Sequence, residues 1–219
     1  MPTAAKHAAK HAGKQTAPPA ERGSDAQQAP ASLDECRRCE LWRHATQAVP
    51  GAGSAHAALM LVGEQPGDSE DRSGLPFVGP AGALLDTILA EAGIERKNVY
   101  VTNAVKHFKW ELRGKRRLHK TPAQREVEAC AYWLEREVAR VQPKVVVALG
   151  ATALRAVLHD PHATLKAHMA QPATVEGVTV VATWHPSYVL RARGEAARDE
   201  ARAQLTAALR EARALLDRR

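Results

Sequence analysis

The chain has 219 residues, of which 45% are hydrophobic, and it carries a formal net charge of +7 with an isoelectric point near 9.6. This length predicts one domain, with or without a tail. The charge makes nucleic acid a reasonable partner, because phosphate binding depends on Lys and Arg. No apolar run approaches the length of a membrane span, and the N-terminus lacks the apolar core of a secretion signal. We therefore expect a monomeric cytoplasmic protein with no membrane partner.

The first 32 residues are rich in Ala, Lys, His, Pro, Ser and Gln, with no bulky apolar residue after Met1. Such a segment cannot bury enough surface to offset its ordering entropy, so residues 1–32 are predicted to be a disordered basic tail. Its KHAAKHAGK run is either a passive solubilising segment or a loose contact to nucleic acid. The folded domain is expected to span residues 33–219.

Apolar strand patterns alternate with helical patterns from residue 58 onward. In chain order the expected elements are a strand at 58–63, a helix at 80–92, a strand at 99–105, a helix at 122–141, a strand at 144–150, a helix at 151–158, a strand at 178–183 and a helix at 195–216. This order predicts an α/β fold, a three-layer α/β/α sandwich around a central, mainly parallel four-stranded sheet. Ligands of such sheets gather at the carboxyl ends of the strands. The rule selects GEQPG after the first strand, Asn103 in the second and HPS after the last.

Most of the net charge is concentrated in residues 106–120, KHFKWELRGKRRLHK, where the only acid is Glu111. One interpretation is a solvated basic loop. The other is a loop that faces DNA, which the interleaved Phe108 and Trp110 favour.

Three cysteines, Cys36, Cys39 and Cys130, include one CxxC pair. An odd number with this spacing indicates metal binding or redox chemistry rather than a disulfide framework.

Four segments resemble the uracil-DNA glycosylase superfamily: GEQPGDSEDRSGLPFVGPAGALLD (63–86), VTNAVKHFKW (101–110), KRRLHKTP (115–122) and HPSYVLR (185–191). With the cysteines, the resemblance spans residues 33 to about 215. Within this superfamily the chain is similar to family 4, and closest to the X-class bacterial proteins that form a covalent adduct with uracil-containing DNA. The resemblance implies DNA repair by base flipping and cleavage of the N-glycosidic bond, on single-stranded DNA and, as a further candidate, on duplexes.

The resemblance assigns the base pocket. Phe77 would stack beneath uracil, Asn103 would supply the amide that reads its edge, and Gly63, Gln65 and Gly67 would line the floor. The alternatives are a core aromatic for Phe77 and a strand-ending cap for Asn103.

Cleavage leaves negative charge on uracil and positive charge on the sugar, so the site needs a donor at the uracil oxygen. His185 matches that role and Ser187 a contact to phosphate, while three carboxylates could stabilise the sugar cation: Glu64, Asp68 and Asp71. Gln65 stands where many family 4 members have alanine, a mark of the X class. Its size and polarity would crowd or reorient the attacking water.

The X-class loop histidine attacks C1′ of the sugar, and His119 in KRRLH occupies that position. The neighbours Lys115, Arg116 and Arg117 would disfavour a protonated imidazole and leave a nitrogen able to attack. These three residues and Arg191 are the expected DNA contacts. Two alternatives stay open: a turnover family 4 enzyme that releases uracil, and a non-enzymatic, metal-stabilised nucleic-acid-binding module.

For the metal, the resemblance adds His107 to Cys36, Cys39 and Cys130, because family 4 has a cysteine at the position of His107. A [4Fe–4S] cluster is the expected cofactor, and zinc, which also accepts three Cys and one His, is the alternative.

Overall fold

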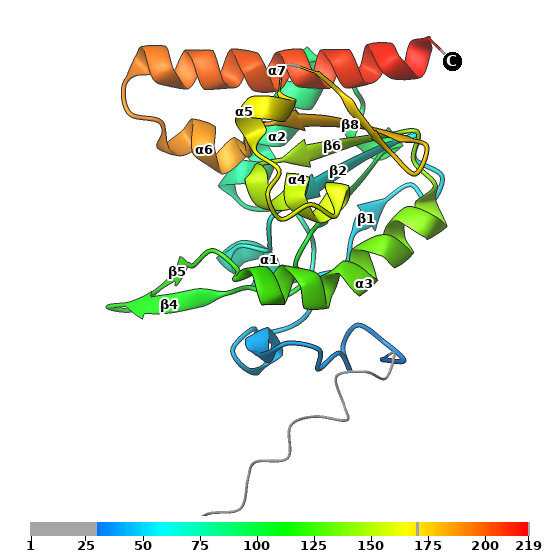
Figure 1. Ribbon diagram of the computed structural model, residues 1–219. Helices are drawn as coiled ribbons and strands as arrows, with labels where there is room; N and C mark the ends of the chain where they lie inside the picture. The colour runs from blue at the N-terminus through cyan, green and yellow to red at the C-terminus, as the bar shows by residue number, and fades with distance from the viewer. Residues whose placement is uncertain (1–29, 170, 219) are drawn as a thin grey trace, which may run out of the picture.

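The computed structural model of the chain describes residues 30–169 and 171–218 (Figure 1). The expected disordered tail lies outside the described residues except for positions 30–32. Within the described ranges, no helix is both long and apolar enough to cross a membrane.

The core of the molecule is a mixed six-stranded sheet in the order β1-β3-β2-β6-β8-β7. Four parallel strands form its centre: β3 (Val99–Asn103), β2 (Leu59–Gly63), β6 (Val145–Leu149) and β8 (Val178–Thr183). The expected sheet of four strands was therefore too small, because antiparallel edge strands β1 (Ala52–Gly53) and β7 (Ala173–Val175) flank it. Strands of two or three residues are too short for an apolar alternation to reveal them.

Helices cover both faces of the sheet (Figure 1). The four expected helices are present as α2 (Pro80–Glu91), α3 (Gln124–Val141), α4 (Ala151–Leu158) and α7 (Glu195–Asp217). Shorter elements that were not anticipated are α1 (Asp68–Ser73), α5 (Leu165–His168), α6 (Pro186–Arg191) and the 3-10 turns η1 (Glu40–Arg43) and η2 (Arg96–Asn98).

Side chains of each central strand alternate between two apolar layers, as the pleat requires. In β2, Leu59 and Leu61 pack in the layer with α2 and α7. Met60 and Val62 belong to the opposite layer with α3 and α4. Because both faces of the sheet are covered, the sequence of β2 is a continuous apolar run. The expected three-layer arrangement is confirmed.

We expected the basic segment to be a loop. It is instead a two-stranded antiparallel hairpin of β4 (Trp110–Arg113) and β5 (Arg116–His119). Trp110 pairs with His119 at its base, and Gly114, with a φ of 62°, lies in the turn. The hairpin extends away from the main sheet (Figure 1). An isolated hairpin of this size is marginally stable in water, so its position depends on contacts at its base.

Candidate active site

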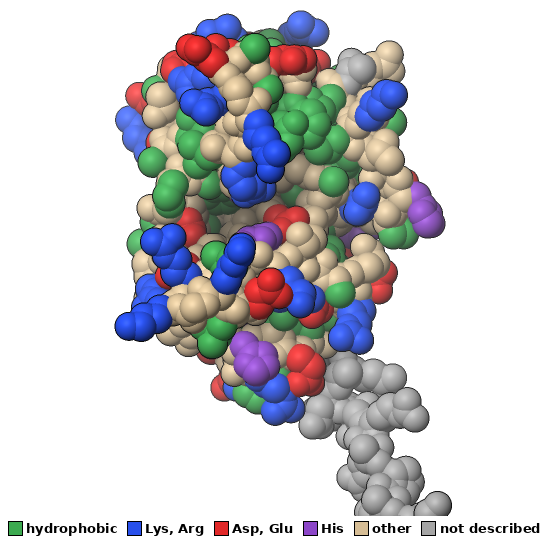
Figure 2. Space-filling view, turned by 90° about the vertical axis from the view of Figure 1, so that its left-hand side faces the viewer, with side chains coloured by type: hydrophobic (Ala, Val, Ile, Leu, Met, Phe, Trp, Pro, Cys, Tyr) green, Lys and Arg blue, Asp and Glu red, His purple; other side chains and the backbone are tan. Residues whose placement is uncertain are grey.

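A cavity of about 800 Å³ lies at the carboxyl ends of the central strands. Figure 2 shows the face of the molecule on which a hollow holds acidic and histidine side chains, with Lys and Arg side chains above and beside it. Ten of the residues expected at the site line the cavity: Glu64, Gln65, Gly67, Asp68, Phe77, Asn103, His119, His185, Ser187 and Arg191.

One wall of the cavity, called the slot below, is formed by Phe77 and Asn103. Gly63, expected in the floor, lies behind them and does not line the cavity; it ends β2 beside β3 and pairs with Asn103 in the parallel register. A Cβ on Gly63 would lie 2.4 Å from Asn103 Oδ1 and 2.7 Å from Phe77 Cζ. Glycine is therefore required there because the amide and the aromatic ring approach the backbone so closely. Asn103 and Phe77 thus converge on one point of the cavity, as an edge-reading amide and a stacking ring must.

Phe77 has a φ of 56°, which is a strained conformation for a residue with a side chain. Gly82 in α2 packs directly on it, since a Cβ on Gly82 would lie 1.9 Å from the Phe77 carbonyl oxygen. The close approach of α2 holds the Phe77 backbone in place, so its ring is positioned before any ligand arrives.

His185 follows β8 and caps α6. The backbone N–H of Ser187 donates to His185 Nδ1 at 3.1 Å, so Nδ1 is the unprotonated nitrogen. Burial lowers the pKa of His185 to about 4, against the opposing effect of Glu64, and His119 and Arg191 lower it as well. At neutral pH the ring is uncharged and its proton is on Nε2. Ser187 Oγ lies 2.8 Å from the same Nδ1, so its hydroxyl is engaged by the histidine.

Glu64 follows β2, and both its oxygens have partners. His119 Nε2 lies 3.1 Å from Oε1, and Thr152 Oγ1 donates to Oε2 at 2.5 Å. Burial by itself raises the pKa of Glu64, but the hydrogen bonds from His119 and Thr152 and the charges of His119 and His185 bring it below its ordinary value. The carboxyl group is therefore ionised at neutral pH.

Gln65 anchors the base of the hairpin. Its Nε2 donates to the carbonyl oxygens of Lys109, at 3.1 Å, and Lys120, at 3.3 Å, while its Oε1 accepts from the Lys109 N–H at 3.0 Å. These residues flank β4 and β5. The carboxamide is thus held by the hairpin backbone, while Gln65 also lines the cavity.

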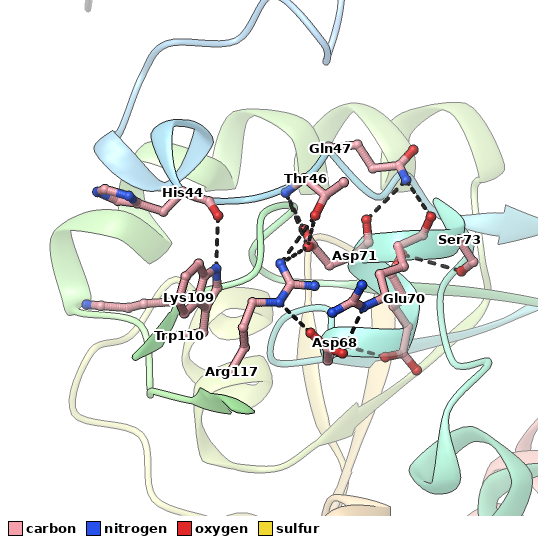
Figure 3. A network of polar contacts seen from close by, with 12 residues as sticks. His44, Thr46, Gln47, Asp68, Glu70, Asp71, Ser73, Lys109, Trp110 and Arg117 are labelled. Carbon is pink, nitrogen blue, oxygen red and sulfur yellow. Dashed lines mark hydrogen bonds and ion pairs between the residues drawn. The ribbon is translucent and has the colours of Figure 1, made fainter. Parts of the chain in front are cut away.

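Arg117 of β5 forms ion pairs with Asp68, at 2.5 Å, and Asp71, at 2.7 Å (Figure 3). Asp71 is fully buried, and Thr46 also donates to it through its hydroxyl, at 2.6 Å. The Arg117 guanidinium thus faces the protein, and Asp71 does not line the cavity. Lys115 and Arg116 remain exposed at the hairpin turn.

The three cysteines lie in one region. Burial raises the pKa of the Cys130 thiol to about 12, and Cys39 and Cys36 are close enough to raise it further, against the effect of Lys106. Burial also lowers the pKa of His107, as does Arg37, the neighbour of Cys36. Among the described residues, however, no group of three or more His, Cys, Asp or Glu side chains is arranged to hold a metal ion. The donors fit a thiolate-bound metal in chemistry and neighbourhood, without an assembled coordination geometry.

Two polar residues of the site escaped the sequence analysis. Thr152 follows β6 and Gly150 at the same sheet edge as the predicted residues. The rule that ligands gather at strand ends could therefore have identified it. Glu70 in α1 accepts the N–H of Gly67, at 3.0 Å, and of Gly79, at 2.8 Å, joining two loops of the cavity wall. No spacing rule reveals that second contact.

The chain is thus an α/β/α protein whose cavity brings an aromatic ring and an amide together with a carboxylate and two histidines. The family model "Uracil DNA glycosylase superfamily" matches residues 50–210, and the chain belongs to this superfamily. It is 37% identical over 162 residues to the type-4 uracil-DNA glycosylase of Thermotoga maritima, covering 74% of this chain and 81% of the relative. It is 35% identical over 178 residues to a type-4 enzyme of Pyrobaculum aerophilum, covering 76% and 87%. The protein is an enzyme of the uracil-DNA glycosylase type.

Proposed function

We propose that this enzyme excises uracil from DNA and releases it, leaving an abasic site. The names of its relatives, type-4 uracil-DNA glycosylases, favour this reaction over a permanent adduct. The observation that carries the proposal is the fixed tautomer of His185: the Ser187 N–H occupies Nδ1, so a neutral ring presents Nε2–H as a donor.

The geometry supports a role for each part of the cavity. A flipped uracil would lie against Phe77 and Asn103, with Asn103 reading its edge. As the C1′–N1 bond breaks, its electron pair leaves with uracil, and the His185 Nε2–H stabilises the negative oxygen. The ionised Glu64 stabilises the positive sugar. A water then adds to C1′ and gives one proton to Glu64, which passes it to solvent, and the uracil anion takes up a proton from solvent. Arg191, Lys115 and Arg116 are our candidates for contacts to the DNA phosphates.

A second candidate function is covalent capture of the sugar by His119, in which case the chain is closest to the X-class proteins. One observation favours it: His119 lines the cavity and its Nε2 lies 3.1 Å from Glu64 Oε1. In this reaction one imidazole nitrogen bonds to C1′ as the bond to uracil breaks. Glu64 accepts the proton of the other ring nitrogen, so the ring stays neutral and is a poor leaving group.

One experiment tests both. The protein is mixed with an oligonucleotide containing a single uracil, and the products are separated on a denaturing gel, with an alkali-treated sample to reveal abasic sites. Release predicts a cleaved product after alkali with many turnovers per protein. Capture predicts a heat-stable shifted band that His119→Ser abolishes. If uracil DNA stays intact and unshifted, both candidates are wrong, and binding that ignores uracil would favour a non-enzymatic nucleic-acid-binding module.

We also propose that Cys36, Cys39, His107 and Cys130 hold a [4Fe–4S] cluster, with zinc as the alternative occupant. The mutual proximity of the three thiols and the burial of His107 support this ligand set. Bound there, the group would join the N-terminal segment to α3 and serve as a structural link, since glycosidic cleavage requires no electron transfer. Iron, sulfide and zinc analysis of the purified protein tests the assignment: stoichiometric zinc in a colourless protein would overturn the iron cluster.

A further inference from the structure

Glu64 joins the hairpin to the sheet edge in the cavity wall, and its orientation is set from two sides. His119 from β5 lies at Oε1. Thr152, the second residue of α4, donates its hydroxyl to Oε2. A carboxylate with only one of these partners would be free to rotate about its terminal torsion, which has a broad energy profile.

The chain places Thr152 there by a rigid route. β6 runs parallel to β2 beside it, with Ala148 paired to Val62, so the segments that follow the two strands emerge side by side. Gly150 then turns the chain with a φ of 95°, and its N–H donates to the Thr183 carbonyl oxygen at 2.8 Å. Thr152 is therefore fixed by the sheet and by the start of α4 rather than by a mobile loop.

We propose that Thr152 is a positioning residue for the glycosidic cleavage. By occupying Oε2 of Glu64, its hydroxyl orients the carboxylate so that Oε1 is presented to His119 and the negative charge is held where the sugar cation forms. This inference rests on the proposed function of Glu64 at the sugar.

The electrostatics of Glu64 add a pH signature. The charged or titratable groups that face it are His119 from β5 and His185 from the turn after β8, with Arg191 of α6 next to His185. The hydrogen bond from Thr152 is one of the interactions that lower the pKa of Glu64. Removing that donor raises this pKa, so the acidic limb of the pH–rate profile moves to higher pH.

The test compares Thr152→Val, which keeps the shape and removes the donor, with Thr152→Ser, which keeps the donor. Thr87→Val is the matched control, because the exposed Thr87 donates its hydroxyl to the Ala83 carbonyl oxygen within α2 and does not line the cavity. The readout is the single-turnover rate on a uracil oligonucleotide, measured from about pH 3.5 to pH 9 because the pKa of Glu64 lies below its ordinary value, and as a function of DNA concentration. A hydrogen bond to a charged group corresponds to about 10-fold or more in rate.

We expect Thr152→Val to lower the rate about 10-fold at pH 7 and to shift the acidic limb upward, with the half-saturating DNA concentration changed by less than about 2-fold. Thr152→Ser and Thr87→Val are expected to behave as the wild type. An unchanged rate and profile in Thr152→Val, or equal losses in the Val and Ser variants, would overturn the proposal.

A second measurement separates this inference from the proposed function. Carbon-13 NMR of the Glu64 carboxyl follows its titration without substrate, and we expect a higher pKa in Thr152→Val than in wild type. If the wild type neither releases uracil nor captures DNA, the proposed function fails. An unchanged Glu64 titration, by contrast, overturns the role of Thr152 whatever the activity.

Discussion

The two walls of the cavity are built by opposite means. The base slot belongs to the sheet: Gly63 and Asn103 end adjacent parallel strands, and both lie within the packed core of the domain. Its geometry follows from backbone register and from close packing, in which a single methyl group has no room. The slot is therefore expected to be the rigid wall.

The hairpin wall, in contrast, is tethered by polar contacts. Among the residues that the structure describes, β4 and β5 pair only with each other, and Gln65 and Arg117 provide bonds that connect them to the domain. Polar contacts of this kind give small net stabilisation when exposed and large penalties when one buried partner is removed. The hairpin is thus positioned by a few specific side chains, each of which can be tested.

The two walls therefore serve different tasks. The slot selects a flat base by shape, whereas the hairpin brings His119 to Glu64 and so determines what happens at the sugar. Variants of the slot should impair release and capture alike. Variants of the hairpin should alter stability and the behaviour of His119 while leaving base selection intact.

The largest effect is expected from Arg117→Gln, which removes the cation from buried Asp71. An uncompensated buried carboxylate costs about 3–5 kcal/mol of the free energy of unfolding, and Arg117 and Asp71 are only 14% and 0% exposed. Urea unfolding of variant and wild type measures this loss. Arg116→Gln, on the exposed turn of the same strand, is the control and should change stability by less than about 0.5 kcal/mol. Equal losses in the two variants would show that the tether is unimportant.

His185→Ala tests the rigid wall and is expected to slow cleavage about 10²- to 10³-fold, the loss typical for one donor to a developing oxyanion. Both uracil release and any adduct should fall together. Because the pKa of His185 lies near 4, its Nε2–H remains a neutral donor throughout pH 5–8. In this range the wild-type rate should show no limb due to His185. A loss smaller than 10-fold in single-turnover rate would remove His185 from the reaction.

The sequence was most informative about the rigid wall. Continuous apolar runs predicted all four central strands, and the rule that ligands gather at strand ends led to Glu64, Asn103 and His185. These inferences succeed because buried strands require a distinctive composition and because parallel strands bring distant residues to one edge.

The sequence was less informative about the hairpin wall. Its charged residues were interpreted as a DNA-facing loop, although β4 and β5 pair and Arg117 faces Asp71. A sequence records the sign of a charge but not its partner, so a solvated arginine and a buried one look alike. The contact of Gln65 with Lys109 and Lys120 joins residues more than forty positions apart, which no local pattern encodes.

Gly63→Ala should narrow the slot. The new Cβ would lie 2.4 Å from Asn103 Oδ1, so the amide or the Phe77 ring must shift. A displacement of about 1 Å at a reacting site corresponds to about 10²-fold in rate. Single-turnover assays should show this loss with the half-saturating concentration of uracil DNA also raised, because the slot binds the base. Wild-type kinetics in a folded Gly63→Ala protein would show that the base does not contact Asn103 and Phe77.

The smallest effect is expected from Gln65→Ala, which removes three hydrogen bonds from the hairpin base. Each such bond contributes about 1 kcal/mol net, and Gln65 is itself buried. We expect about 10-fold slower reaction at C1′ and faster amide hydrogen exchange across residues 110–119, with inhibition by free uracil unchanged because the slot is intact. Gln124→Ala, which removes an exposed carboxamide on α3, is the control and should leave both unchanged. If exchange accelerates while the reaction keeps its wild-type rate, His119 takes no part in the chemistry, and the hairpin serves only to bind DNA.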